Sequence, residues 1–286
     1  MNKLKYDVFK KLINVGVTHA ELSFILYMCM NQDTDGIVTG VYYKDTMIES
    51  GISHETFYNV LESLKAKGVI SFVRTLSDDY DITVMGNDFS DGDYSKGYLS
   101  LRKKVFRSPS FKKLKVNEQL LIMDLLCICQ SNHGKYKIGV DKYIQNYMNI
   151  FHVSSRTIRK YLRAVKKFFE VSRDQGIYTI IPKKMLKVTV EHSDEQGLHT
   201  YLIKTMARRH RIKHPTVQEI TETAKLVNQY RCYAEIAGCN IWSVLQDCLE
   251  SSIDIINQYK KARDKKEYSL RYKLIHKLVR QALKMA

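Results

Sequence analysis

The segment 154–168 constrains the fold more than any other, because it combines a helix start, an apolar stripe and a face of one charge. Ser154 or Ser155 can accept a hydrogen bond from the free backbone N–H groups of a first helical turn. The apolar side chains recur at helical spacing, at Ile158, Tyr161, Leu162 and Val165. Most remaining positions carry cations, and no Asp or Glu lies between Ser154 and Phe169. The segment therefore predicts an amphipathic helix with one buried face and one cationic face.

The residues on both sides of this helix complete a compact pattern. Residues 140–150 predict a short helix, and residues 169–173 and 177–181 predict two strands. The tripeptide 174–176, Asp-Gln-Gly, is a hairpin turn signal between those strands. Two helices followed by a hairpin are the order of a winged helix-turn-helix, whose second helix enters the major groove of DNA. We interpret the cationic helix as this DNA-contacting element; the alternative is a charged face that is merely solvated.

A second copy of the pattern occurs earlier in the chain, over residues 18–85. Thr18 and Glu21 fit a capping box at a helix start. The segments that follow predict a helix at 42–49, a Ser53-capped helix at 54–67, and hairpin strands at 69–74 and 80–85. Aligning Glu21 with Glu118, Gly40 with Gly139 and Ser53 with Ser154 gives numbering offsets of 97, 99 and 101. Small loop insertions would produce such a gradual increase.

These patterns predict a fold that is mainly α with small β-hairpins, an α+β class. We expect two tandem winged helix-turn-helix modules at 1–90 and 116–190, a basic linker at 91–115, and an all-helical C-terminal domain at 191–286. In that last domain the closing helix shows an apolar stripe of Leu270, Leu274, Leu278 and Ala282, flanked by Ile275 and Val279. Such stripes could pack on one another, on the second module or on a partner.

The charge is unevenly distributed along the chain, whose formal net charge is +16. Residues 91–190 hold 21 Lys and Arg against 7 Asp and Glu, whereas residues 1–90 hold 8 against 12. A domain as basic as 91–190 attracts phosphate backbones through counterion release. The corresponding helix of the acidic module would direct outward His54, Glu55, Tyr58, Asn59, Glu62 and Lys65. We therefore favour a protein–protein role for the first module over base recognition with few phosphate contacts.

The predicted DNA-binding residues fall in four places. The cationic helix and its cap supply Ser154, Ser155, Arg156, Thr157, Arg159, Lys160, Arg163, Lys166 and Lys167. The preceding helix, the hairpin and the linker add Lys142, Arg173, Arg102, Lys103 and Lys104. The linker cations could follow a phosphate backbone or only keep the chain soluble. The basic cluster 208–214 is either a further phosphate contact or a charged helix end that offsets the helix dipole.

Catalytic and cofactor motifs are absent from the sequence. It holds no phosphate-cradling glycine loop, serine nucleophile elbow or His-Glu-x-x-His. Cys127 and Cys129 lie two residues apart, which places them on different faces of a helix, and the acidic run 78–81 fits a solvated turn better than a cation site. We expect a protein that is not an enzyme and has no cofactor or metal. Irregularly spaced cysteines and the lack of a membrane-spanning apolar run predict a cytoplasmic protein.

Two winged-helix modules with the cations concentrated in the second resemble the tandem winged-helix replication initiators of plasmids and phages, and related DNA-binding regulators. The resemblance covers the architecture of residues 18–182 and no diagnostic motif. It implies a homodimer contact through the first module and double-stranded DNA binding by the 154–167 helix and the hairpin around Arg173. Residues 191–286 depart from that family and are similar to the primosome-loading helical domains of low-GC bacterial initiators. That similarity implies a replication or transcription partner.

Other functions fit parts of the sequence. The winged helices could be protein interaction modules with only non-specific DNA binding. The basic surface could bind RNA, although the sequence lacks an exposed aromatic stacking motif. An initiator and a transcription regulator share every feature described above, so both stay open.

Overall fold

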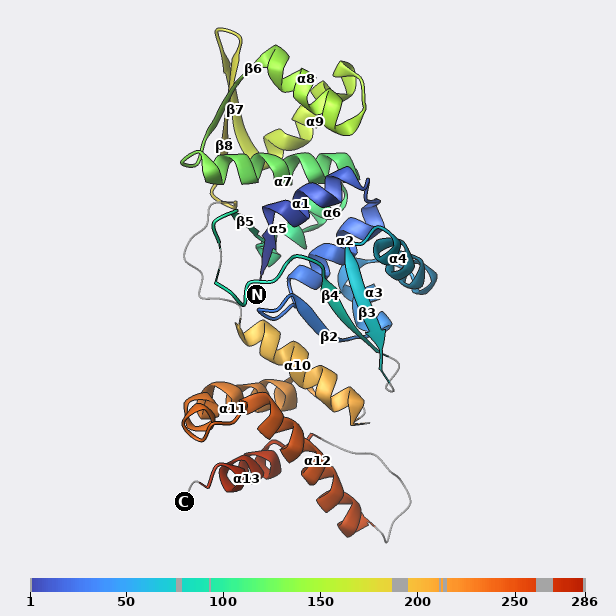
Figure 1. The fold of residues 1–286 in the computed structure, drawn as a ribbon, viewed down its shortest axis with the longest axis vertical. Helices are drawn as coiled ribbons and strands as arrows, with labels where there is room; N and C mark the ends of the chain where they lie inside the picture. Colours follow the sequence, from blue (N-terminus) through green and yellow to red (C-terminus); the bar gives the residue numbers. More distant parts are fainter. Residues whose placement is uncertain are drawn as a thin grey trace. The chain divides into compact units, whose positions relative to one another are not determined.

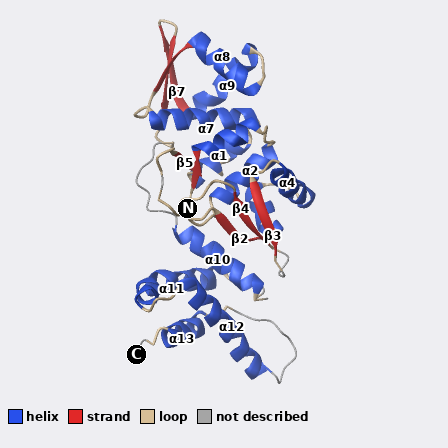
Figure 2. Cartoon of the chain, in the orientation of Figure 1, coloured by secondary structure: helices blue, strands red, loops and turns tan. Residues whose placement is uncertain are grey.

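The computed structural model describes residues 2–75, 79–92, 94–186, 195–210, 212, 215–260 and 270–284. The chain has an α+β fold in which helices predominate, and its described strands form small antiparallel sheets (Figures 1 and 2). It divides into two compact units. Unit 1 comprises Met1–Arg74 and Tyr80–Ser193, and unit 2 comprises Thr75–Asp79 and Asp194–Ala286.

The first half of unit 1 is built from helices around a three-stranded sheet. Its elements are β1 (Lys3–Lys5), α1 (Tyr6–Asn14), α2 (His19–Cys29), β2 (Ile37–Val41), α3 (Tyr43–Ser50), α4 (His54–Ala66), β3 (Ile70–Arg74) and β4 (Tyr80–Val84). The antiparallel strand order is β2-β4-β3. Phe24, Phe57 and Leu61 are almost completely buried and hold α4 against α2.

The second half of unit 1 repeats that order of elements, with one more helix between its first two strands. Its elements are β5 (Tyr98–Ser100), α5 (Lys103–Phe106), α6 (Pro109–Lys112), α7 (Val116–Ser131), β6 (Tyr136–Gly139), α8 (Val140–Phe151), α9 (Ser155–Phe168), β7 (Phe169–Asp174) and β8 (Ile177–Pro182). The strand order β6-β8-β7 matches the first sheet, and β1 pairs with β5 in a separate ribbon. The sequence predicted the two hairpins but not β2 and β6, the third strand of each sheet.

The repeated helix caps form as the sequence predicted. Thr18 and Glu21 make a reciprocal capping box at the start of α2. The Oγ atoms of Ser53 and Ser154 accept hydrogen bonds from the backbone N–H groups of Thr56 and Thr157, at 3.2 and 3.4 Å. In the second hairpin, residues 175 and 176 both have positive φ, +43° and +76°, as a two-residue type I′ turn requires. Local chemistry therefore sets the ends of α2, α4 and α9.

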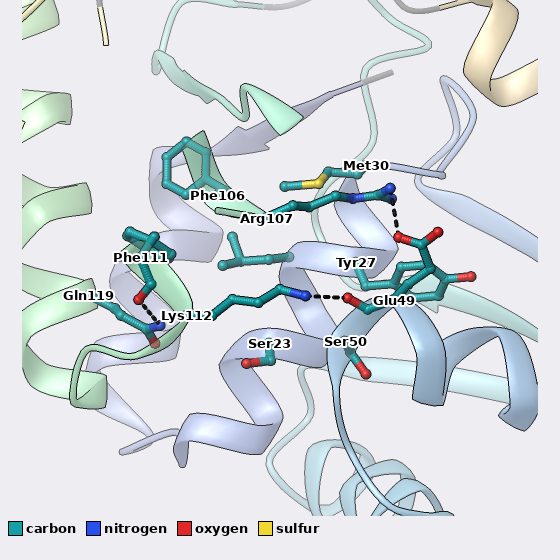
Figure 3. A pocket seen from close by; sticks show the side chains of 11 residues that line it. Ser23, Tyr27, Met30, Glu49, Ser50, Phe106, Arg107, Phe111, Lys112 and Gln119 are labelled. Carbon is teal, nitrogen blue, oxygen red and sulfur yellow. Dashed lines mark hydrogen bonds and ion pairs between the residues drawn. The ribbon is translucent and has the colours of Figure 1, made fainter. Parts of the chain in front are cut away.

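The segment 91–115, which the sequence suggested was a linker, contains folded elements. Leu99, Phe106 and Phe111 are buried in unit 1, on β5, α5 and α6. Arg107 forms an ion pair with Glu49 of α3 at 2.7 Å, and Lys112 Nζ donates to the Glu49 carbonyl oxygen at 2.6 Å (Figure 3). The aromatic and aliphatic residues between the cations explain this, because they supply a buried face that a solvated connector would not need.

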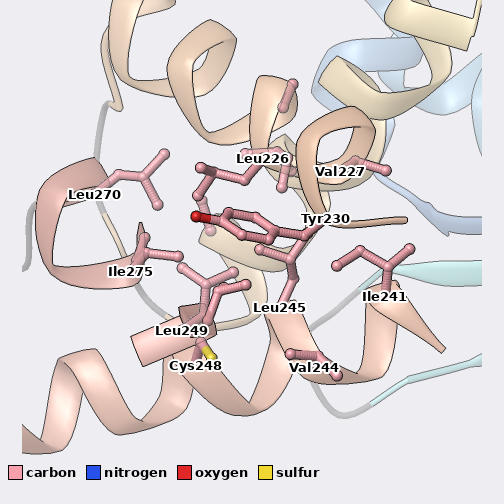
Figure 4. Close-up of a cluster of buried hydrophobic side chains, with 14 of the residues drawn as sticks. Leu226, Val227, Tyr230, Ile241, Val244, Leu245, Cys248, Leu249, Leu270 and Ile275 are labelled. Atoms are coloured by element: carbon pink, nitrogen blue, oxygen red, sulfur yellow. The ribbon is translucent and has the colours of Figure 1, made fainter. Parts of the chain in front are cut away.

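The secondary-structure elements that the structure describes in unit 2 are all helices. Its helices are α10 (Glu195–Arg209), α11 (Val217–Ile236), α12 (Ile241–Lys260) and α13 (Tyr272–Ala282). Tyr230, Leu245 and Ile275 lie together in its core (Figure 4). On α13 the buried face is centred on Ile275 and Val279, both fully buried, whereas Ala282 is exposed. Of the expected stripe, Leu270 is buried and Leu278 is partly buried, so the buried face combines part of the stripe with the flanking positions 275 and 279.

Candidate nucleic-acid interface

Helix α9 is anchored by its apolar stripe and presents its cations to solvent. Ile158 and Val165 are fully buried, and Tyr161 and Leu162 are nearly so. The exposed side chains on the opposite face are Arg156, Arg159, Lys160, Arg163, Lys166 and Lys167. Ser154 caps the N-terminus of the helix, and Ser155, Arg156 and Thr157 follow it in the first turn. The predicted amphipathic division of this helix is confirmed.

These cations have no acidic partners among the described residues. Arg159 reaches only the Oγ of Ser155, at 3.4 Å, and no ion pair involves the other five. Uncompensated like charges at helical spacing repel one another by a few tenths of a kcal/mol for each pair. The arrangement therefore costs stability, which an anionic ligand would recover.

The first turn of α9 also opposes the helix dipole. Arg156 occupies the second helical position, where the partial positive charge of a helix N-terminus disfavours a cation by about 0.3–1 kcal/mol. Other helices carry an acid in that turn, namely Asp7, Glu21, Asp45, Glu55, Glu118, Asp141 and Glu219. Helix stability thus does not account for the cation at Arg156.

Helix α4 holds the equivalent place in the first half of unit 1, with the opposite charge. At the constant offset of 101 residues, Glu55 corresponds to Arg156 and Glu62 corresponds to Arg163. The predicted outward set of α4 is exposed: His54, Glu55, Tyr58, Asn59, Glu62 and Lys65. The two helices share a buried pattern and a cap, so their surfaces, and not their folds, distinguish them.

The remaining predicted DNA-binding residues lie at several places in unit 1. Lys142 on α8 and Arg173 on β7 are exposed. Lys104 is exposed on α5, whereas Lys103 is only partly exposed. The guanidinium of Arg102 donates to the Met185 carbonyl oxygen at 3.0 Å, and is therefore also part of the fold.

The sequence reasoning did not select two other cations in this half of unit 1, Lys183 and Lys137. Lys183 Nζ donates to the carbonyl oxygen of Lys166 in the last turn of α9, at 2.8 Å. Lys137 is exposed on β6, opposite Thr179 in the sheet register. Lys183 directly follows the second hairpin strand in the sequence, so its position next to the predicted hairpin could have identified it. Lys137 lies in a four-residue strand that is too short to show a clear alternation.

The first two arginines of the basic cluster at 208–214 are already paired with an acid. Within unit 2, Arg208 and Arg209 form ion pairs with the buried carboxylate of Asp79, at 3.0 and 3.1 Å. Burial alone would raise the pKa of Asp79, but hydrogen bonds from Arg209, Thr75 and Arg208 hold it below its usual value. Residues 211, 213 and 214, and Asp78 of the acidic run, lie outside the described residues.

A pocket in unit 1 lies where α2, α3, α5, α6 and α7 meet (Figure 3). Gln119 lines it, donates from Nε2 to the Phe111 carbonyl oxygen at 2.9 Å, and has no partner for its buried Oε1 among the described residues. The residues that line the pocket come from both halves of unit 1, and none of them belongs to α9. The pocket is therefore separate from the cationic face.

No group of three His, Cys, Asp or Glu side chains in the described part of the chain could hold a metal ion. Cys127 and Cys129 are buried, and burial raises the pKa of the Cys129 thiol to about 12. Both sulfurs are free of disulfide bonds. A thiol with so high a pKa stays protonated at neutral pH, which disfavours both nucleophilic and metal-binding chemistry.

Comparisons with known proteins identify no relative of this chain. No protein-family model, curated protein or solved structure matches it. The described helices include none whose length and apolar character would let it cross a membrane.

Proposed function

We propose that this chain is a sequence-specific double-stranded DNA-binding protein composed of two tandem winged helix-turn-helix modules, with α9 in the major groove. The observation that carries the proposal is the surface of α9. Six exposed cations, none with an acidic partner among the described residues, lie on this one helix, and the equivalent helix α4 carries glutamates at two of the matching positions. The repeated element order and the matching strand orders β2-β4-β3 and β6-β8-β7 support the winged-helix assignment.

Most of the predicted cations have a role in this proposal. Arg156, Arg159 and Arg163 recur every three or four residues and can contact guanine O6 and N7 with two hydrogen bonds each. Lys166 and Lys167, as flexible point charges near the end of the helix, neutralise phosphates. Arg173, Lys142 and residues 102–104 at the start of α5 extend the backbone contact beyond the helix.

The proposed biological role is that of a cytoplasmic replication initiator or transcription regulator of a bacterial plasmid, phage or other mobile element. It follows from the resemblance to tandem winged-helix initiators. An initiator would bind directly repeated sites and recruit a replication partner through its C-terminal helices. A regulator would bind beside promoters.

The charge reversal on α4 favours a different role for the first module. Glu55 and Glu62 would repel phosphates, whereas the exposed ring of Tyr58 and the imidazole of His54 can contact protein. We propose a protein contact through α4, with a second copy of the chain as its partner. If α9 bound DNA only through charge, the whole protein would instead be an interaction module with non-specific DNA affinity.

The first experiment is a selection from random duplexes at physiological salt with the full chain. An enriched motif supports the proposal, and an unenriched pool contradicts it in favour of the interaction module. The triple variant Arg156→Ala, Arg159→Ala and Arg163→Ala should lose the motif, at a cost of about 1–3 kcal/mol for each base contact. A matched variant, Lys10→Ala, Lys44→Ala and Lys113→Ala, removes the same charge from exposed positions of unit 1 outside α4 and α9 and should keep the motif.

A further inference from the structure

We propose that α13 is a second contact for duplex DNA, which binds backbone phosphates without regard to sequence. This inference rests on the proposed function and assigns unit 2 a share in it. Lys273, Lys277 and Arg280 follow one another at spacings of four and three residues, and Lys284 lies in the turn that closes the helix. All four side chains are exposed. No Asp or Glu occurs in the described segment 270–284.

The apolar face of α13 is already used inside unit 2. Ile275 and Val279 are fully buried against α11 and α12, and the Tyr230 hydroxyl bonds His276 Nε2 at 2.6 Å. At 100° per residue, Lys273, Lys277 and Arg280 lie on the side opposite that core. A membrane-surface helix would need a free apolar face to enter lipid. The partner of α13 must therefore act through charge alone.

The cation in the first turn of α13 is not explained by the stability of the helix. Lys273 occupies the second helical position, where the helix dipole disfavours a cation, as Arg156 does in α9. The neighbouring helix α11 has Glu219 in that turn. Among the described residues, no ion pair involves Lys273, Lys277 or Lys284.

Phosphates of a duplex fit this surface better than a folded acidic protein does. Helices α9 and α13 share a cation in the first turn, three- and four-residue cation spacing and the absence of acids, so one polyanion can serve both. A duplex carries one charge for each ~1.7 Å of its axis. It can therefore engage α13 beside a site held by α9 without any fixed distance between the two helices.

The experiment measures the affinity of the full chain for two duplexes as a function of salt concentration. One duplex contains only the selected motif, and the other extends the motif by about 20 bp of unrelated sequence. The wild type should bind the flanked duplex more tightly and with a steeper salt dependence. The variant Lys273→Gln, Lys277→Gln and Lys284→Gln should lose that gain. On the flanked duplex, the slope of its log affinity against log salt concentration should become shallower by about 2–3 units. Its preference for the motif should not change.

A control variant separates this contact from net charge. Lys10→Gln, Lys44→Gln and Lys204→Gln remove the same charge from exposed positions on other helices and should keep the gain from the flanks. If the wild type gains nothing from the flanks, or if the α13 variant keeps the gain, the inference is wrong, and an acidic protein becomes the partner to seek. The proposed function fails separately, if Arg159→Ala and Arg163→Ala leave motif preference intact on both duplexes.

Discussion

Replacing either partner of the Glu21–Lys67 ion pair should destabilise unit 1, but by very different amounts. Lys67 Nζ lies 2.8 Å from the Glu21 carboxylate, which also accepts from Ser63 Oγ and the Thr18 N–H, each at 2.6 Å. The Glu21 side chain is 3% exposed and the Lys67 side chain is 25% exposed. The carboxylate therefore cannot return to water in the fold, whereas the ammonium can.

This asymmetry sets the expected magnitudes. Lys67→Met leaves a buried carboxylate with only two neutral donors. It should lower the free energy of unfolding by about 3 kcal/mol, the lower end of the range for breaking a buried ion pair. Glu21→Gln keeps an acceptor for Ser63 and for the capping box, and Lys67 can turn outward, so about 1 kcal/mol is expected. Lys113→Met, at an exposed position, should stay within about 0.5 kcal/mol.

The pH dependence gives an independent test. Burial alone would raise the pKa of Glu21, but the bonds from Lys67, Ser63 and Thr18 hold it below its usual value. A lowered folded-state pKa contributes stability above the unfolded pKa that is lost as pH falls through the folded pKa. In the Lys67→Met variant burial should dominate and raise the pKa of Glu21, so that acid protonates this carboxylate and removes the cost of burying its charge. Its deficit relative to wild type should therefore shrink in acid.

Amide hydrogen exchange of α2 and α4 is the appropriate assay, because it reports the free energy of opening locally. The only tryptophan, Trp242, belongs to α12 in unit 2 and would not report on this pair. Equal costs for Lys67→Met and Glu21→Gln at neutral pH, or a Lys67→Met deficit that does not change in acid, would refute the reasoning.

Two further predictions concern the second half of unit 1. Burial raises the pKa of Asp124, although its carboxylate accepts a hydrogen bond from the Tyr147 hydroxyl at 2.7 Å. The contribution of Asp124 to stability should therefore be complete below its unfolded-state pKa and be lost as pH rises through its folded-state pKa. Asp124→Asn should remove that decline in pH-dependent unfolding; an identical pH profile would contradict it. Gly176 has φ +76° with open space around a new Cβ, so Gly176→Ala should cost about 1–2 kcal/mol in unfolding free energy from backbone strain alone. Gly176→Asn should cost less, because Asn tolerates the left-handed region, and equal costs would argue against strain.

The elements that the sequence predicted are those specified by neighbouring residues. Serine caps, a capping box and the turn at 174–176 act within a few positions, and the structure has all of them. Strand β6 has only four residues, and its hydrogen bonds come from β8, about 40 residues away, with Ile138 opposite Tyr178. Such a strand has no local signal strong enough to distinguish it from a loop.

The folded elements within 91–115 were missed for a related reason. Their cations suggested a solvated connector, whereas the ion pair of Arg107 with Glu49 joins residues 58 positions apart. The pairs of Asp79 with Arg208 and Arg209 span about 130 positions. Charge composition predicted where cations gather along the chain, but not which of them are neutralised by distant acids. The α9 cations differ because no acid occurs on their own helix and no described ion pair involves them.

The opposite charges of α4 and α9 constrain how any DNA site could be organised. Both helices have the same cap and the same buried spacing, so each would present its second and ninth helical positions to the same kind of groove. Glu55 and Glu62 at those positions in α4 would face phosphates with like charge, whereas Arg156 and Arg163 in α9 would attract them. We therefore expect one major-groove contact from each chain. A repeated site would then need two chains held at a defined spacing, and a protein contact through the acidic module would provide that link.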